Sequence, residues 1–171
     1  MAEDVRSILL GTTGVSVAAL LALFLTVTRG RAISSPAELR AAARVAGIAV
    51  VIQSAHFAEE LATGFHQRFP EQLGLTAWSP YFFVPFNLFW LVVWVLSCRG
   101  LVAGRQPALA ALWFLAIAGL VNGVAHPLLS VRAGSYFPGI ITSPFLAAVG
   151  FLLLRRLASV TRGPAAARGA A

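Results

Sequence analysis

Three residues within an apolar stretch of the chain have side chains that can do chemistry. His56, Glu59 and Glu60 lie within residues 45–63, in a chain that has only six acidic residues. At about 100° per residue, a helix places Glu59 roughly 60° to one side of His56 and Glu60 roughly 40° to the other. The three side chains can therefore share one face, and Gln53 falls on the same face. Imidazole and carboxylate groups in this arrangement can bind a divalent metal ion or transfer protons.

The composition predicts that this polar face lies in a membrane protein. Hydrophobic residues make up 58% of the 171 residues and charged residues 11%, whereas soluble domains have about 25% charged residues. Ionisable residues inside apolar membrane helices are costly to bury, and they usually mark functional sites. We therefore interpret the His/Glu cluster as a functional site. The alternative interpretation is a polar contact that holds helices together.

The apolar segments predict an all-α fold, a polytopic transmembrane bundle of about five spanning helices. Each segment has roughly the 17 to 25 residues that cross a bilayer as a helix. The spans are expected near residues 8–28, 45–65, 81–98, 108–131 and 140–156. Residues 1–162 would form one membrane domain, and residues 163–171, which contain only Ala, Gly, Pro and Arg, are expected to form a disordered tail.

Local signals predict where individual helices begin and end. Pro36, preceded by two serines and followed by Glu38, favours a helix start for the second span. We expect that helix to end at Phe69–Pro70 and the fifth span to begin at Ile140.

The arginine distribution predicts the orientation of the bundle. All 13 basic residues are arginines, and they lie at the ends of the apolar segments. With five spans, ten fall on one side of the membrane and three on the other. The positive-inside rule then places the N-terminus outside and the C-terminus in the cytoplasm. Because membrane topology explains the net charge of +7, we expect no nucleic-acid partner.

Further polar residues occur in the fourth span and in front of the fifth. Asn122 and His126 are four residues apart and share a helix face. Tyr136 and Thr142 flank a turn at Pro138–Gly139. The second and fourth spans run in the same direction and carry their polar residues in their later halves. We therefore expect these side chains to converge in the outer half of the bundle.

The order and spacing of these residues resemble the HXXEE family of small bacterial integral membrane proteins. The motifs are His56-Phe-Ala-Glu59-Glu60, Asn122-Gly-Val-Ala-His126 and Tyr136-Phe-Pro-Gly-Ile-Ile-Thr142, and the resemblance covers about residues 45–154. The family usually has Ala where this chain has Gly123, and because both residues are small we expect little effect. The resemblance implies a location in the bacterial cytoplasmic (inner) membrane. It implies no reaction, because the family has no established activity.

We favour a membrane-embedded enzyme that acts on a hydrophobic or lipid-like small molecule. In one mechanism a divalent metal, zinc or iron, would support hydrolysis or oxidation. Its candidate ligands are His56, Glu59, Glu60 and His126. The single cysteine, Cys98, excludes a cysteine-based metal site.

In the other mechanism no metal takes part, and the protein is an isomerase. Adjacent carboxylates in an apolar environment do not both ionise easily, so one can hold a proton while the other accepts one. The candidate catalytic residues are Glu59, Glu60, His126 and Tyr136. Gln53, Asn122 and Thr142 are candidate supporting residues.

Two other function classes remain open. A proton-coupled transporter or relay would need polar residues across the whole bilayer and a homo-oligomer, yet the cytoplasmic halves of the spans lack ionisable residues. A non-catalytic assembly protein would use the cluster only as a contact between helices. The aromatic residues of the third span are interpreted as packing or lipid contacts rather than as a substrate pocket.

Overall fold

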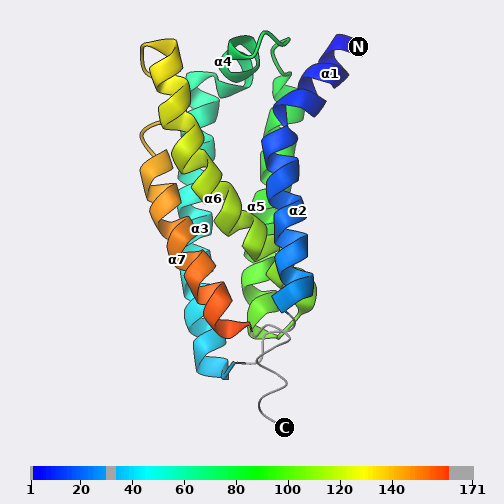
Figure 1. Ribbon diagram of the computed structural model, residues 1–171, viewed down its shortest axis with the longest axis vertical. Helices are drawn as coiled ribbons and strands as arrows, with labels where there is room; N and C mark the ends of the chain where they lie inside the picture. The colour runs from blue at the N-terminus through cyan, green and yellow to red at the C-terminus, as the bar shows by residue number, and fades with distance from the viewer. Residues whose placement is uncertain (1, 30–33, 162–171) are drawn as a thin grey trace.

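The computed structural model describes residues 2–29 and 34–161, and the predicted disordered tail at 163–171 lies outside them. The described residues form seven α-helices (Figure 1). They are α1 (Ala2–Gly11), α2 (Thr13–Arg29), α3 (Pro36–Thr63), α4 (Phe65–Gln72), α5 (Pro80–Val102), α6 (Gln106–Ala133) and α7 (Ser143–Val160). The predicted all-α fold is confirmed.

Four of the described helices, α3, α5, α6 and α7, are long and apolar enough to cross a membrane. The helices α1 and α2 give a fifth span if they are counted together, although they are bent by 47°. The first apolar segment is therefore two helices rather than one, and the bend lies at Thr12. Its hydroxyl bonds back to the carbonyl of Ile8 at 2.7 Å, a contact that often bends helices.

The start of α3 agrees with the sequence prediction, but its end does not. Ser35 and Glu38 form a reciprocal capping box, and Pro36 occupies the first turn. The helix ends at Thr63 rather than at Phe69–Pro70, because Gly64 adopts a left-handed conformation with φ of 79°. After this turn α4 lies across the end of the bundle (Figure 1).

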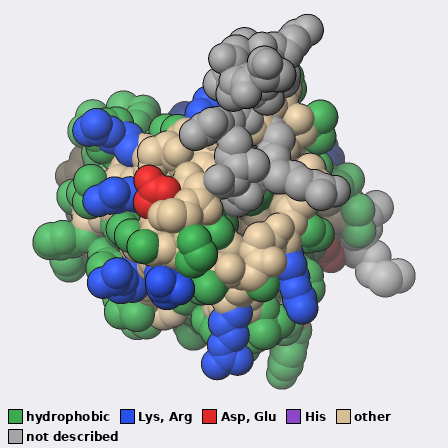
Figure 2. Space-filling model, turned by 90° about the horizontal axis from the view of Figure 1, so that it is seen from below, with side chains coloured by type: hydrophobic (Ala, Val, Ile, Leu, Met, Phe, Trp, Pro, Cys, Tyr) green, Lys and Arg blue, Asp and Glu red, His purple; other side chains and the backbone are tan. Residues whose placement is uncertain are grey.

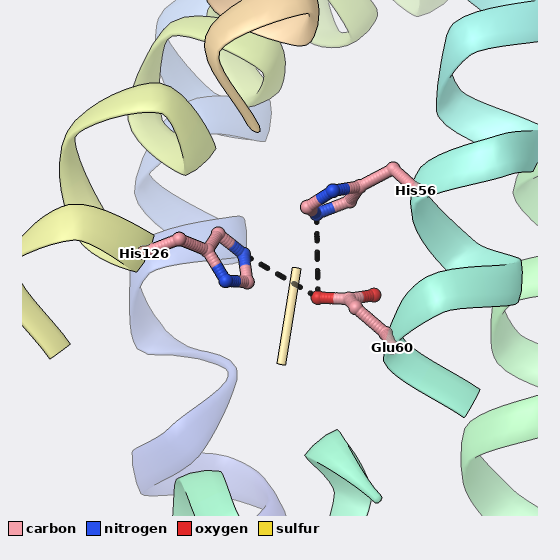
Figure 3. Close-up of side chains that lie close together, drawn as sticks. All are labelled: His56, Glu60 and His126. Atoms are coloured by element: carbon pink, nitrogen blue, oxygen red, sulfur yellow. Dashed lines mark ion pairs between the residues drawn. The ribbon is translucent and has the colours of Figure 1, made fainter. Parts of the chain in front are cut away.

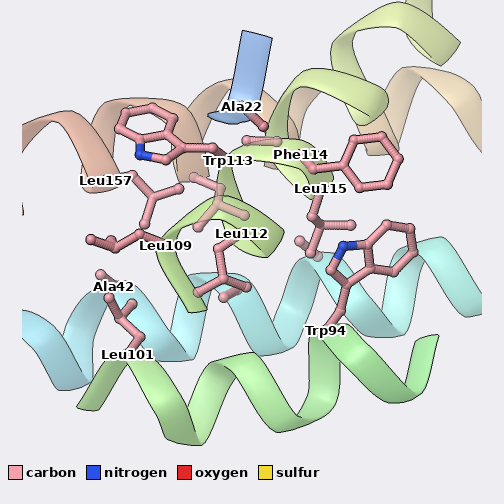
Figure 4. Close-up of a cluster of buried hydrophobic side chains, with 14 of the residues drawn as sticks. Ala22, Ala42, Trp94, Leu101, Leu109, Leu112, Trp113, Phe114, Leu115 and Leu157 are labelled. Atoms are coloured by element: carbon pink, nitrogen blue, oxygen red, sulfur yellow. The ribbon is translucent and has the colours of Figure 1, made fainter. Parts of the chain in front are cut away.

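The core surrounds α6, which runs diagonally between the other helices (Figure 1). Five consecutive residues of α6 are buried, from Leu112 to Ala116. A helix that is buried on all sides must be apolar on all sides, as this part of α6 is. Its side chains pack with those of α2, α3, α5 and α7 in the half of the bundle nearer the C-terminus (Figure 4).

Glycines allow α6 and α7 to approach closely. A Cβ atom on Gly119 would lie 2.9 Å from the carbonyl oxygen of Leu146, and one on Gly123 would lie 2.2 Å from Cβ of Ala147. Both distances are too short for a real contact. The expectation that Ala in place of Gly123 would have little effect is therefore wrong for this chain, because α7 leaves no room for the methyl group.

The segment between α6 and α7 forms turns. It begins at Gly134 (φ 62°) and includes Gly139 (φ 86°), a backbone conformation that favours glycine. The fifth span was expected to begin at Ile140, but α7 begins at Ser143. The left-handed Gly139 interrupts helical geometry there, and the loop folds back toward α3.

Candidate metal centre

The structure brings together three of the predicted site residues. His56 and Glu60 lie one turn apart on α3, and His126 reaches them from α6 (Figure 3). The Nε2 atoms of His56 and His126 lie 3.4 Å and 3.5 Å from the same atom, Oε1 of Glu60. All three residues are buried, with exposed fractions of 0%, 1% and 6% for His56, His126 and Glu60. Each histidine lies seven residues before the end of its helix, which is about 10 Å along the axis.

A backbone carbonyl orients the imidazole of His126. Its Nδ1 atom lies 2.6 Å from the carbonyl oxygen of Pro138. A carbonyl oxygen can only accept a hydrogen bond, so Nδ1 carries the hydrogen. In the neutral imidazole this leaves a lone pair on Nε2, directed toward Glu60.

A threonine hydroxyl orients the imidazole of His56 in the same way. Thr142 Oγ1 donates its single hydrogen to Oε2 of Glu59 at 2.6 Å. Nδ1 of His56 lies 2.7 Å from the same Oγ1, which can therefore only accept from it. The lone pair of His56 Nε2 thus also faces Glu60, and Nε2 has no hydrogen-bond partner among the described residues.

Three electron-pair donors consequently face one another in a buried site. The ligand atoms of His56, Glu60 and His126 all lie within 4.8 Å of one another. Two ligands at about 2.1 Å from a tetrahedral zinc ion are about 3.4 Å apart, close to the spacing between each imidazole and Glu60. Hydrogen bonds from Nδ1 to a carbonyl or hydroxyl are also the usual supports of metal-binding histidines. The donor set fits a divalent metal ion.

Glu59, expected beside Glu60 as a ligand and catalytic group, contacts the loop before α7 instead. Its Oε1 accepts hydrogen bonds from the hydroxyl of Tyr136 at 2.8 Å and the backbone N–H of Ile141 at 3.1 Å. Its Oε2 accepts from the backbone N–H and the hydroxyl of Thr142, at 2.9 Å and 2.6 Å. Successive side chains on a helix point about 100° apart, so one carboxylate meets the loop and the other meets His126.

Tyr136 contacts Glu59 and not the three converging ligand atoms. Burial and the hydrogen bond to Glu59 raise the pKa of the Tyr136 hydroxyl above its usual value. The hydroxyl therefore remains a neutral donor at physiological pH. Arg68 fixes this part of the loop, because its Nη2 donates to the carbonyl of Tyr136 at 2.9 Å.

Gly139 is a site residue that sequence reasoning identified only as part of a turn. A Cβ atom there would lie 2.4 Å from Cε1 of His126 and 2.8 Å from Cε1 of His56. The two imidazole rings are perpendicular, with centroids 4.7 Å apart. The loop can reach both rings only because this position has no side chain. The carbonyl of Pro138 was also missed, since a sequence motif does not show where a backbone oxygen points.

The supporting residues Gln53 and Asn122 lie beside the ligand group, in the wall of a cavity of about 370 Å³. Glu60 and His126 also line this cavity, and most of the remaining wall is apolar. Aromatic side chains of α5 form part of it: Phe82, Phe83, Phe86, Trp90 and Trp94. The predicted packing or lipid contact agrees with Phe83 and Trp94, which are buried in hydrophobic clusters, and with Phe89, which is 60% exposed. The prediction did not include the cavity that these aromatic side chains help to line.

A comparison with protein families agrees with the three motifs. A family model described as a protein of unknown function with HXXEE motif matches residues 47–153, more than half of the chain. No curated protein and no solved structure matches the chain. The matched segment contains the ligand group His56, Glu60 and His126 and the loop that supports it. The chain belongs to the HXXEE family.

Proposed function

We propose that this protein is a membrane-embedded metalloenzyme in which His56, Glu60 and His126 bind a divalent metal ion. The observation that carries the proposal is the convergence of two imidazole lone pairs on one carboxylate oxygen. Both Nδ1 atoms are already committed as donors, so neither ring can turn its Nε2 into a donor without gaining a charge.

Protons bound to these three side chains would pair the two imidazole lone pairs and the carboxylate less well than a metal ion would. One proton on Oε1 of Glu60 would bond one imidazole and leave the other lone pair facing an oxygen. Protonating both His56 and His126 would place two imidazolium ions beside one carboxylate in a buried site, which is costly. A divalent cation interacts favourably with all three ligand atoms. The metal-dependent mechanism is therefore favoured over the metal-free isomerase.

The ligand set also narrows the chemistry. Two histidines and one carboxylate occur in catalytic zinc sites and in non-haem iron oxygenases, and in both cases coordination positions remain open. When bound, zinc would supply an activated water for hydrolysis and iron would supply oxygen chemistry. The distances of 3.4 Å and 3.5 Å favour tetrahedral zinc. The chain's own residues orient the ligands: Thr142 and Glu59 act on His56, and the Pro138 carbonyl acts on His126.

The cavity supports an apolar, lipid-like substrate. Its volume of about 370 Å³ falls in the range of small-molecule sites. Glu60 and His126 are part of its wall, so a molecule in the cavity would lie next to the metal ligands. Gln53 and Asn122 supply the amide groups that can orient a polar group of that molecule.

The apolar side chains of the core favour the function of an enzyme over that of a proton relay. Beyond the ligand group, the half of the bundle shown in Figure 4 is filled with apolar side chains such as Leu109, Leu112 and Leu157. A relay through this half would need ionisable groups there. We further propose that the arginine-rich end is cytoplasmic, in a bacterial inner membrane, which places the ligand group in the outer half of the bilayer.

Metal content tests the proposal. Full-length protein purified in detergent would be analysed by elemental mass spectrometry, beside His56→Ala, His126→Ala and Glu60→Gln. The matched control is His66→Asn, which alters the only other histidine of the chain. We expect about one equivalent of metal in the wild type and the control, and a near-complete loss in the three site variants.

Two results would overturn the proposal. One is a wild type that binds no zinc, iron or manganese even after each metal is added back. The other is a metal that stays bound in all three site variants. Size-exclusion profiles would show that each variant is folded, so that loss of metal is not mistaken for loss of structure.

A further inference from the structure

A second candidate site lies at the opposite end of the bundle from the metal centre. A groove of about 560 Å³ runs between the first turns of α3 and the last turns of α5. It is lined by Arg40, Ala43, Arg44, Cys98, Arg99 and Val102. Arg44 precedes His56 by twelve residues on α3, about 18 Å along the helix axis. The groove is therefore separate from the cavity beside Glu60.

Among the described residues, no acidic side chain pairs with the three arginines of this groove. Arg40 and Arg44 are exposed and lie one turn apart on α3, and Arg99 is exposed in the last turn of α5. Among the side chains of residues 4–29 and 34–161, none makes an ion pair or hydrogen bond with these arginines. Glu38 does not line the groove, and its carboxylate bonds Ser35. Figure 2 looks onto this end of the molecule, where basic side chains project from the surface at several places.

The floor of the groove is apolar. Ala43 and Cys98 are half-buried between the two helices, and Val102 is exposed beside them. Guanidinium groups bind phosphate oxygens with paired hydrogen bonds, whereas an apolar floor favours a hydrocarbon chain. The charged rim of the groove is thus complementary to the phosphate of a phospholipid, and the apolar floor is complementary to its acyl chain.

The position in the bundle agrees with a lipid. Arg40 and Arg44 lie where the candidate span α3 begins, and Arg99 lies where the antiparallel span α5 ends. Ends of spanning helices lie at the depth of lipid headgroups, and basic pockets between helices at this depth bind anionic headgroups.

We propose that this groove binds an anionic phospholipid, with its phosphate between Arg40, Arg44 and Arg99 and an acyl chain over Ala43 and Val102. The site is independent of the metal centre and of the proposed enzymatic function.

Native mass spectrometry of the full-length protein in neutral detergent tests the proposal, with phosphatidylglycerol and phosphatidylcholine added at equal concentration. The test variant is Arg40→Gln/Arg44→Gln/Arg99→Gln. The matched control is Arg155→Gln/Arg156→Gln, which removes exposed arginines of the same end that do not line the groove. Each arginine near an anionic headgroup contributes roughly fivefold in affinity, so we expect about a hundredfold weaker phosphatidylglycerol binding in the triple variant. The control should retain wild-type binding.

The single cysteine gives a second measurement that needs no substitution in the groove. Cys98 lines it, so bound phosphatidylglycerol should slow alkylation of Cys98 by a neutral maleimide in the wild type and in the control. In the triple variant the same lipid should have little effect. Equal binding of both lipids by the wild type, or equal losses in the triple variant and the control, would overturn the proposal. Displacement of the lipid by free glycerol phosphate at the same concentration would also overturn it, since that result indicates a site for soluble anions.

Discussion

His56 and Thr142 lie 86 residues apart in the sequence, and Nδ1 of the histidine contacts Oγ1 of the threonine at 2.7 Å. Because the threonine hydroxyl donates to Glu59, it accepts from the imidazole. One hydroxyl therefore determines which nitrogen of His56 faces Glu60. This contact links the His/Glu motif on α3 to a threonine in front of α7.

Replacing Thr142 should weaken metal binding without removing a ligand. Thr142→Val keeps the shape of the side chain but leaves the Nδ1 hydrogen of His56 without its acceptor. Loss of such a support typically lowers metal affinity about 10- to 100-fold. Thr142→Ser keeps the hydroxyl and should bind as the wild type does. Competition with a zinc chelator measures both affinities, and equal affinities for Val and Ser variants would contradict the assigned role.

Glu59 and Glu60 should differ in what their glutamine variants do to the metal. Glu60→Gln removes a charged ligand atom and should abolish stoichiometric binding. Glu59→Gln places an amide NH₂ among four hydrogen-bond donors, so it should disturb the loop and weaken binding by about 10- to 100-fold. X-ray absorption of the metal-loaded Glu59→Gln variant should show wild-type coordination. A missing oxygen ligand in that spectrum would instead make Glu59 a direct ligand.

Gly139→Ala should displace the two histidines, and Gly134→Ala provides a matched control. Both glycines have positive φ, so both substitutions carry a backbone cost of about 1–2 kcal/mol. A Cβ at Gly134 meets nothing within 4 Å, whereas one at Gly139 meets His126 and His56. We expect Gly134→Ala to lower the melting temperature modestly and keep the metal. Gly139→Ala should lower it further and lose the metal; equal effects of the two variants would show that only backbone strain matters.

Tyr136 should titrate above the usual range of tyrosine, and Glu59 should be part of the cause. Burial and the hydrogen bond to Glu59 raise the pKa of Tyr136 in the folded protein. The neutral hydroxyl therefore stabilises the folded state, and this contribution is complete at pH values below the ordinary pKa of about 10. It is lost as the pH rises through the raised value. The measurement is an ultraviolet absorbance titration of the wild type and of Tyr136→Phe. The difference between the two curves gives the titration of Tyr136 without that of Tyr81. Glu59→Gln should move the transition to lower pH, and an unchanged transition would show that the Glu59 contact has no effect.

The sequence by itself identified the helical class and the residues of the candidate site. Apolar runs of bilayer length predict helices regardless of how they pack, and Ser35 with Glu38 signals the start of α3 through contacts within one turn. Ionisable residues in such runs are conspicuous because burial makes them costly. His56, Glu60 and His126 could therefore be selected before their geometry was known.

Only the tertiary structure decided what each of these residues contacts. Glu59 and Glu60 are chemically identical neighbours, and their contacts differ because His126 of α6 lies on one side of α3 and the loop before α7 lies on the other. The tautomers of His56 and His126 depend on Thr142 and the Pro138 carbonyl. The close approach at Gly123 and Gly139 depends likewise on distant elements. Such contacts are set by packing between segments far apart in the chain, and local sequence patterns carry little information about them.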